Sequence, residues 1–77
     1  MKYGISGKQI KELAESEGIN HMYLYQILSG KRRPSLELAI RLYEKTGVHV
    51  SVWASRNSAK ISAELAKKYQ RRKRVRT

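Results

Sequence analysis

IKELAESEGINHMYLYQILSG, residues 10–30, is the stretch of sequence that decides the fold of this chain. Its first half has apolar residues at positions i, i+3 and i+4, the spacing of one helix face: Ile10, Leu13 and Ala14. Ser6 is a suitable N-cap before this segment, and Gly18 supplies the left-handed residue that commonly stops a helix. We therefore expect a first helix that starts near Ser6 and ends at Glu17.

The second half of the stretch predicts another short helix, from His21 to about Ser29. Asn20 is a strong N-cap for it, and Gly30 ends it. The residues expected to face the core are apolar: Leu24, Ile27 and Leu28. The opposite face is polar and aromatic: His21, Met22, Tyr25, Gln26 and Ser29. Two short helices joined by a tight turn, the second with such an uncovered face, predict a helix-turn-helix arrangement.

A third helix is expected from Ser35 to about Thr46, with Pro34 at its start and Gly47 at its end. Its apolar residues line one face and then extend beyond it: Leu36, Ala39, Ile40 and Tyr43, together with Leu38 and Leu42. Because so much of its surface is apolar, we expect this helix to be the best covered in the molecule.

The segment VHVSVWA, residues 48–54, fits two structures. Its alternating valines indicate a strand, but a short run of this kind also fits the start of a short helix. A strand here would pair with Met1–Ile5, where Tyr3 and Ile5 alternate weakly, or with its own copy in a dimer. The sequence leaves strand and helix open.

A last helix is expected from Ala59 to about Arg71, capped by Asn57 or Ser58. Its apolar stripe is thin and repeats every fourth residue: Ile61, Leu65 and Tyr69. This stripe predicts that the helix docks on the body of the protein or on a second subunit.

Taken together, these elements predict an all-α fold, a small helix-turn-helix bundle of four to five helices with a possible short strand at 48–54. We expect a helix-turn-helix domain at residues 1–54 and a basic C-terminal helix and tail at 55–77. The end of that tail, Arg71–Thr77, is dense in like charge and is expected to be disordered when free.

Charge distinguishes this chain more than its size does. The 77 residues have a formal net charge of +11, of which residues 1–54 contribute +3 and residues 55–77 contribute +8. A basic body with a still more basic end predicts a polyanionic partner. Nucleic acid is the first candidate, and an anionic membrane surface is the rival.

Composition argues against an enzyme. The chain has no cysteine and no aspartate, and its two histidines, His21 and His49, are too far apart in sequence to suggest a metal site. A glycine-rich phosphate loop and a histidine–carboxylate pair at useful spacing are both missing. We therefore expect no catalytic residue, cofactor, metal or small-molecule substrate. No apolar run reaches the roughly 20 residues of a membrane span, so we expect a cytoplasmic, nucleoid-associated protein without a membrane partner.

Three residues meet the packing demands of a helix-turn-helix. Ala14 is small enough for the helices to approach, Gly18 permits the sharp turn, and Leu24 holds the second helix from inside. Further features are LAESEGIN, the Tyr-Leu-x-Gln-Ile core of the second helix, SGKRRPS after it, and a leucine-rich helix ending in TGV. With these features residues 10–48 resemble the helix-turn-helix of the lambdoid phage repressor and Cro type, also called the Xre-like family.

The resemblance implies which residues touch DNA. The base-reading positions of the family correspond here to His21, Met22, Tyr25 and Gln26. Residue chemistry agrees, because glutamine pairs with adenine N6 and N7 and methionine can contact a thymine methyl group. The resemblance and the charge together predict a set of phosphate contacts: Asn20, Ser29, Lys31, Arg32, Arg33, Arg71, Arg72, Lys73, Arg74 and Arg76.

The sequence departs from the family before the motif. Family members carry an additional helix there, whereas only a short segment precedes Gly7 in this chain. The last helix is a candidate to fill that place. Family members also often have a Thr-Gln pair ahead of Leu-Ala, with the glutamine bracing the recognition helix. Gln9 lies one position early for that role.

The expected function is that of a sequence-specific, double-stranded DNA-binding transcriptional regulator. The resemblance implies a Cro-like or repressor-like protein of a phage or mobile element, which binds a palindromic operator as a homodimer. Two alternatives remain: an antitoxin that binds both DNA and a toxin, and a basic architectural protein that binds nucleic acid without site preference.

Overall fold

Each helix begins after a residue whose side chain accepts a hydrogen bond from the first turn of that helix. A computed structural model describes residues 3–69, and in that range the chain forms helices and no strand. The elements are α1 (Gly7–Ser16), α2 (His21–Leu28), α3 (Leu36–Thr46), α4 (Val50–Trp53), α5 (Ser58–Glu64) and the π-helical turn η1 (Leu65–Tyr69). Their N-caps are Ser6, Asn20, Ser35, His49 and Asn57. These caps satisfy backbone N–H groups that the helices leave unpaired.

The three helices expected around the central motif are confirmed. Ser6 and Gln9 form a capping box at the start of α1: Ser6 N–H donates to Gln9 Oε1 (2.9 Å), and Gln9 N–H donates to Ser6 Oγ (3.2 Å). Gln9 therefore caps its own helix. The family's glutamine position is occupied by Ile10, which is buried in the core.

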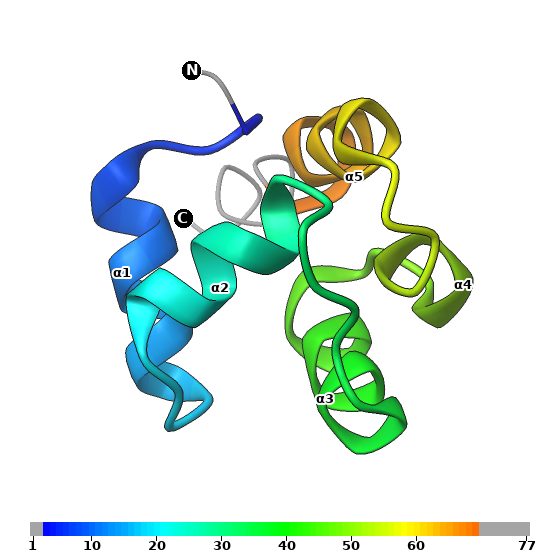
Figure 1. The fold of residues 1–77 in the computed structure, drawn as a ribbon. Coiled ribbons are helices and arrows are strands. Elements are labelled where there is room, and N and C mark those ends of the chain that lie inside the picture. The colour runs from blue at the N-terminus through cyan, green and yellow to red at the C-terminus, as the bar shows by residue number, and fades with distance from the viewer. Residues whose placement is uncertain (1–2, 70–77) are drawn as a thin grey trace.

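One hydrophobic core joins all the helices. Figure 1 shows α2 crossing the middle of the molecule, with α1 on one side of it and α3, α4 and α5 on the other. The fully buried side chains come from each of these elements, and Trp53 of α4 is the largest of them. Ile61, Leu65 and Tyr69 of α5 and η1 belong to the same core. The last helix thus docks on the body of the protein, one of the two expected alternatives.

The segment before α1 packs against α5. Ile5 is buried in the core, and Gly4 lies so close to α5 that a Cβ there would be 2.1 Å from the carbonyl oxygen of Ser62. Figure 1 shows this segment passing beside α5 near the N-terminal end of the chain. The pairing of Met1–Ile5 with a strand at 48–54, one of the alternatives left open by the sequence, does not occur in the described part of the chain, because residues 3–5 form a turn and a bend.

Residues 48–54 form the short helix α4, which resolves the alternative left open by the sequence. His49 caps it, since its Nδ1 accepts a hydrogen bond from the Ser51 N–H at 3.0 Å. Val52 and Trp53 are both buried. Two consecutive residues of a strand point to opposite faces, so a strand would have kept only one of them in this core.

The expected packing of α3 is wrong for three residues. Its core-facing side chains are Leu38, Ala39 and Leu42, whereas Leu36, Ile40 and Tyr43 are 69%, 41% and 43% exposed. A single helix at the edge of a bundle can turn only one arc toward the core. Because apolar residues occupy both arcs of α3, the sequence pattern did not show which arc is buried.

Candidate nucleic-acid interface

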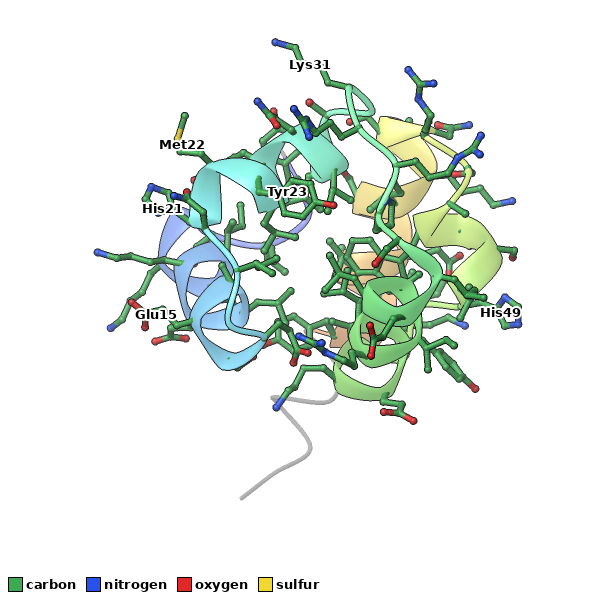
Figure 2. All side chains as sticks on the ribbon, turned by 60° about the horizontal axis from the view of Figure 1, so that its bottom comes forward. Glu15, His21, Met22, Tyr23, Lys31 and His49 are labelled. Carbon is green, nitrogen blue, oxygen red and sulfur yellow. The ribbon has the colours of Figure 1, made fainter. Side chains whose placement is uncertain are left out.

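The face of α2 opposite the core is exposed in its first turn. Leu24, Ile27 and Leu28 are completely buried, whereas His21 is exposed and Met22 is 59% exposed. Figure 2 shows Met22 and His21 pointing away from the body of the protein, with Lys31 extending from the loop after α2. An exposed methionine on a rigid helix places an apolar group where it can meet a ligand.

A hollow of about 350 Å³ lies along this face. It brings together five of the predicted DNA-contacting residues and one residue from outside the motif: Met22, Tyr25, Gln26, Ser29 and Lys31, with Tyr3. The hollow therefore combines an amide, a hydroxyl, an ammonium group and apolar surface. These are the groups that read base edges and bind the DNA backbone.

An aromatic row fixes one wall of this hollow. The ring of Tyr25 meets the ring of Tyr3 edge to face at 5.9 Å and that of His21 at 6.3 Å. The Tyr25 hydroxyl also reaches the start of α1, where a Cβ on Gly7 would lie 3.3 Å from it. Tyr25 is thus a half-buried part of the scaffold, and its position orients both neighbouring rings.

The loop after α2 is held by the end of that helix. The carbonyl oxygen of Gln26 accepts hydrogen bonds from the N–H groups of Lys31 (2.9 Å) and Arg32 (3.2 Å) and from Ser29 Oγ (3.1 Å). The guanidinium of Arg32 lies 5.9 Å from the ring centre of Tyr23, which packs against the core. The side chains of Lys31, Arg32 and Arg33 are exposed. The backbone of a basic loop is therefore fixed while its cations face solvent.

Asn20 has a structural role in addition to the phosphate contact predicted for it. Its Oδ1 accepts a hydrogen bond from the Met22 N–H at 2.7 Å, which caps α2. Because Asn20 is exposed, its amide nitrogen remains on the surface at the start of α2. A helix N-terminus favours anions, so this amide has suitable surroundings for a phosphate.

Two residues that lie beside α2 were missed by sequence reasoning. Tyr3 was interpreted only as part of a weak strand, yet it lines the hollow beside Gln26. Arg56, in the loop between α4 and α5, donates from Nε to the carbonyl oxygen of Gly30 at 3.2 Å. Neither residue carries a local signal, because each reaches α2 only through the tertiary fold.

Five predicted phosphate contacts lie outside the described residues: Arg71, Arg72, Lys73, Arg74 and Arg76. Within residues 3–69, no group of three or more histidine or acidic side chains is placed to hold a metal ion. In the same range, no helix has the length and apolarity needed to cross a membrane.

An open helical face, a hollow lined by amide, hydroxyl and ammonium groups, and a basic loop at its end are typical of a helix-turn-helix DNA-binding protein. The chain belongs to the helix-turn-helix family of the Xre and lambda-repressor type, because the family model described as Helix-turn-helix matches residues 6–53, more than half of the chain. No curated protein and no solved structure matches it. This membership supports a DNA-binding transcriptional regulator, in a family that is typically not enzymatic.

Proposed function

We propose that this protein is a sequence-specific repressor of phage or mobile-element type, which binds a near-palindromic operator as a homodimer. The observation that supports this proposal most strongly is the hollow on α2, where Met22, Gln26 and Lys31 lie together. In this proposal α2 enters the major groove and α1 lies across the DNA backbone. Repression follows from exclusion of polymerase, and the protein performs no chemistry.

The base-reading set of this proposal is His21, Met22, Tyr25 and Gln26. Gln26 presents an amide that can pair bidentately with adenine, and Met22 offers apolar contact to a thymine methyl group. His21 can donate to guanine or to a phosphate. Tyr25 contributes less direct contact with DNA bases, because its ring is packed between Tyr3 and His21 and its hydroxyl points toward Gly7.

The phosphate-binding set surrounds these residues. Asn20 lies at one end of α2, and the exposed cations Lys31, Arg32 and Arg33 lie at the other. Such contacts fix the register of the protein on DNA and make binding depend on salt. The basic residues of 71–76 add charge to this set, which favours a location on DNA in the cytoplasm.

A homodimer is supported by the uncovered face of α3. Leu36, Ile40 and Tyr43 are the large apolar side chains that remain exposed there. The ring of Tyr43 lies 5.6 Å from that of His49, and Figure 2 shows His49 across the molecule from His21 and Met22. This apolar face is therefore available to a second copy while α2 occupies DNA, and the proposed palindrome requires two recognition helices roughly 34 Å apart.

Selection from a library of randomised duplexes tests this function, with the oligomeric state measured by sedimentation in parallel. We expect an enriched palindrome whose half-sites are about one helical turn apart. Tight, salt-sensitive binding to every sequence, without enrichment, would instead identify a basic architectural protein.

A further inference from the structure

Arg56 has a backbone conformation that arginine rarely adopts. Within residues 3–69 it is the only residue other than glycine with a positive φ, at 58°. A side chain in this left-handed region is strained, and the strain persists only where the surrounding structure holds it. Glycine would fit this position without strain, so the arginine side chain itself calls for an explanation.

The residues on either side of Arg56 hold it in place. Ser55 Oγ donates to the carbonyl oxygen of Val52 (2.6 Å) and accepts from the N–H of Asn57 (3.2 Å). The side chain of Asn57 in turn caps α5 by accepting from the Lys60 N–H (3.1 Å). The loop between α4 and α5 is therefore a fixed turn, and Arg56 projects from its middle.

This turn lies directly against the end of α2. A Cβ on Gly30 would be 2.6 Å from the carbonyl oxygen of Arg56, so the two backbones touch. The Nε group of Arg56 donates to the Gly30 carbonyl oxygen. Gly30 immediately precedes Lys31, the residue that Figure 2 shows extending into solvent beyond α2. Arg56 thus joins the three cations of the basic loop, although it is distant from them in sequence.

The guanidinium of Arg56 has donors left for a ligand. A guanidinium has five N–H donors, and the contact with Gly30 uses only Nε. The side chain is exposed, and within residues 3–69 no carboxylate lies within ion-pair distance of it. An exposed guanidinium that is held through Nε and keeps its terminal N–H groups for a ligand matches the oxygens of a phosphate diester.

We propose that Arg56 binds a DNA phosphate beside the one contacted by the basic loop. The DNA interface would then extend beyond the family-matched residues 6–53 into the turn between α4 and α5. This inference rests on the proposed function, because it assumes that α2 is presented to duplex DNA. The strained backbone at Arg56 serves to hold its guanidinium at the end of the recognition helix.

The test measures binding of the full chain to a random-sequence duplex of about 30 base pairs over a range of salt concentrations. Two variants separate charge from backbone strain. Arg56→Gln removes the charge and keeps a side chain in the left-handed conformation, whereas Arg56→Gly removes both the charge and the strain. Lys45→Gln is the matched control, because it removes one exposed positive charge from the last turn of α3.

We expect both Arg56 variants to lose roughly tenfold in affinity, and the slope of log K against log salt to fall by about 1. Lys45→Gln should leave that slope unchanged. The melting temperature of Arg56→Gly should not fall, since glycine adopts the turn without strain.

An unchanged salt slope in both Arg56 variants overturns the inference and leaves Arg56 with only its structural contact to Gly30. If the wild-type protein binds no duplex at any salt concentration, the proposed function itself fails. The two failures are therefore distinguishable in one set of titrations.

Discussion

At the scale of single residues, Gln26 offers the most selective test of base reading. Replacing it with alanine removes an amide from the hollow on α2 without touching the basic loop. We expect Gln26→Ala to weaken binding to the selected operator by about 1–3 kcal/mol and to leave binding to random duplex nearly intact. Fluorescence anisotropy with both duplexes at one salt concentration measures the difference.

Lys31→Gln is the control for this experiment, since a phosphate contact should affect both duplexes equally. If Gln26→Ala also lost the same affinity on operator and random DNA, Gln26 would be a backbone contact and the base-reading assignment would fail.

Alanine substitutions at Gly4 and Gly18 distinguish the cost of steric crowding from the cost of a left-handed backbone. Both have positive φ, at 80° and 69°, but an added Cβ meets the Ser62 carbonyl oxygen at Gly4 and nothing within 4 Å at Gly18. We expect Gly18→Ala to lower the free energy of unfolding by about 1–2 kcal/mol, the cost of the left-handed conformation. Gly4→Ala should cost more, because the segment before α1 must move away from α5.

Urea unfolding followed by the fluorescence of Trp53 measures both changes, since this single tryptophan is completely buried. Equal losses in the two variants would mean that the contact between Gly4 and α5 contributes nothing to stability.

At the scale of elements, the turn between α1 and α2 is tied to α3 by one arginine. Arg41 Nε donates to Glu17 Oε1 (3.1 Å), and its Nη2 donates to the Glu17 carbonyl oxygen (2.5 Å). The Glu17 side chain is only 7% exposed. Removing Arg41 therefore leaves a buried carboxylate that still accepts a hydrogen bond from the hydroxyl of Ser16.

We expect Arg41→Ala to lower the free energy of unfolding by about 3 kcal/mol, because an unpaired buried charge is costly. Glu17→Gln in the same background should recover part of this loss. A double-mutant cycle by thermal unfolding provides the measurement, and a coupling energy of zero would contradict the role assigned to this pair.

Elements whose signals are local could be predicted from the sequence. Asn20 as a cap and Gly18 as a stop act within a few residues, so α1 and α2 were placed correctly. The burial of α3 was not predicted correctly, because Ile40 and Leu42 are equally apolar and only the tertiary fold decides between them. Arg56 escaped prediction for a related reason, since it reaches Gly30 across 26 positions of sequence.

At the scale of the whole molecule, the exposed apolar face of α3 and the open face of α2 differ in chemistry and suit different partners. Apolar patches of this kind mark protein contacts more often than DNA contacts, because phosphates and base edges are polar. A dimer also provides two recognition helices, one for each half-site of a palindromic operator. In the proposed assembly, DNA and a second copy therefore bind different sides of each subunit and do not compete for one surface.

Ile40→Glu tests this arrangement, because a two-fold axis through the α3 face brings the two introduced carboxylates close together. We expect the dissociation constant of the dimer to rise by at least about tenfold, since the new charges repel each other and must be desolvated. Ala63→Glu, which introduces the same charge at an exposed position on α5, should leave the dimer intact. Sedimentation equilibrium measures both. If Ile40→Glu remains as dimeric as Ala63→Glu while operator binding persists, the second copy does not use α3, and the apolar face of Leu36, Ile40 and Tyr43 must serve a different protein.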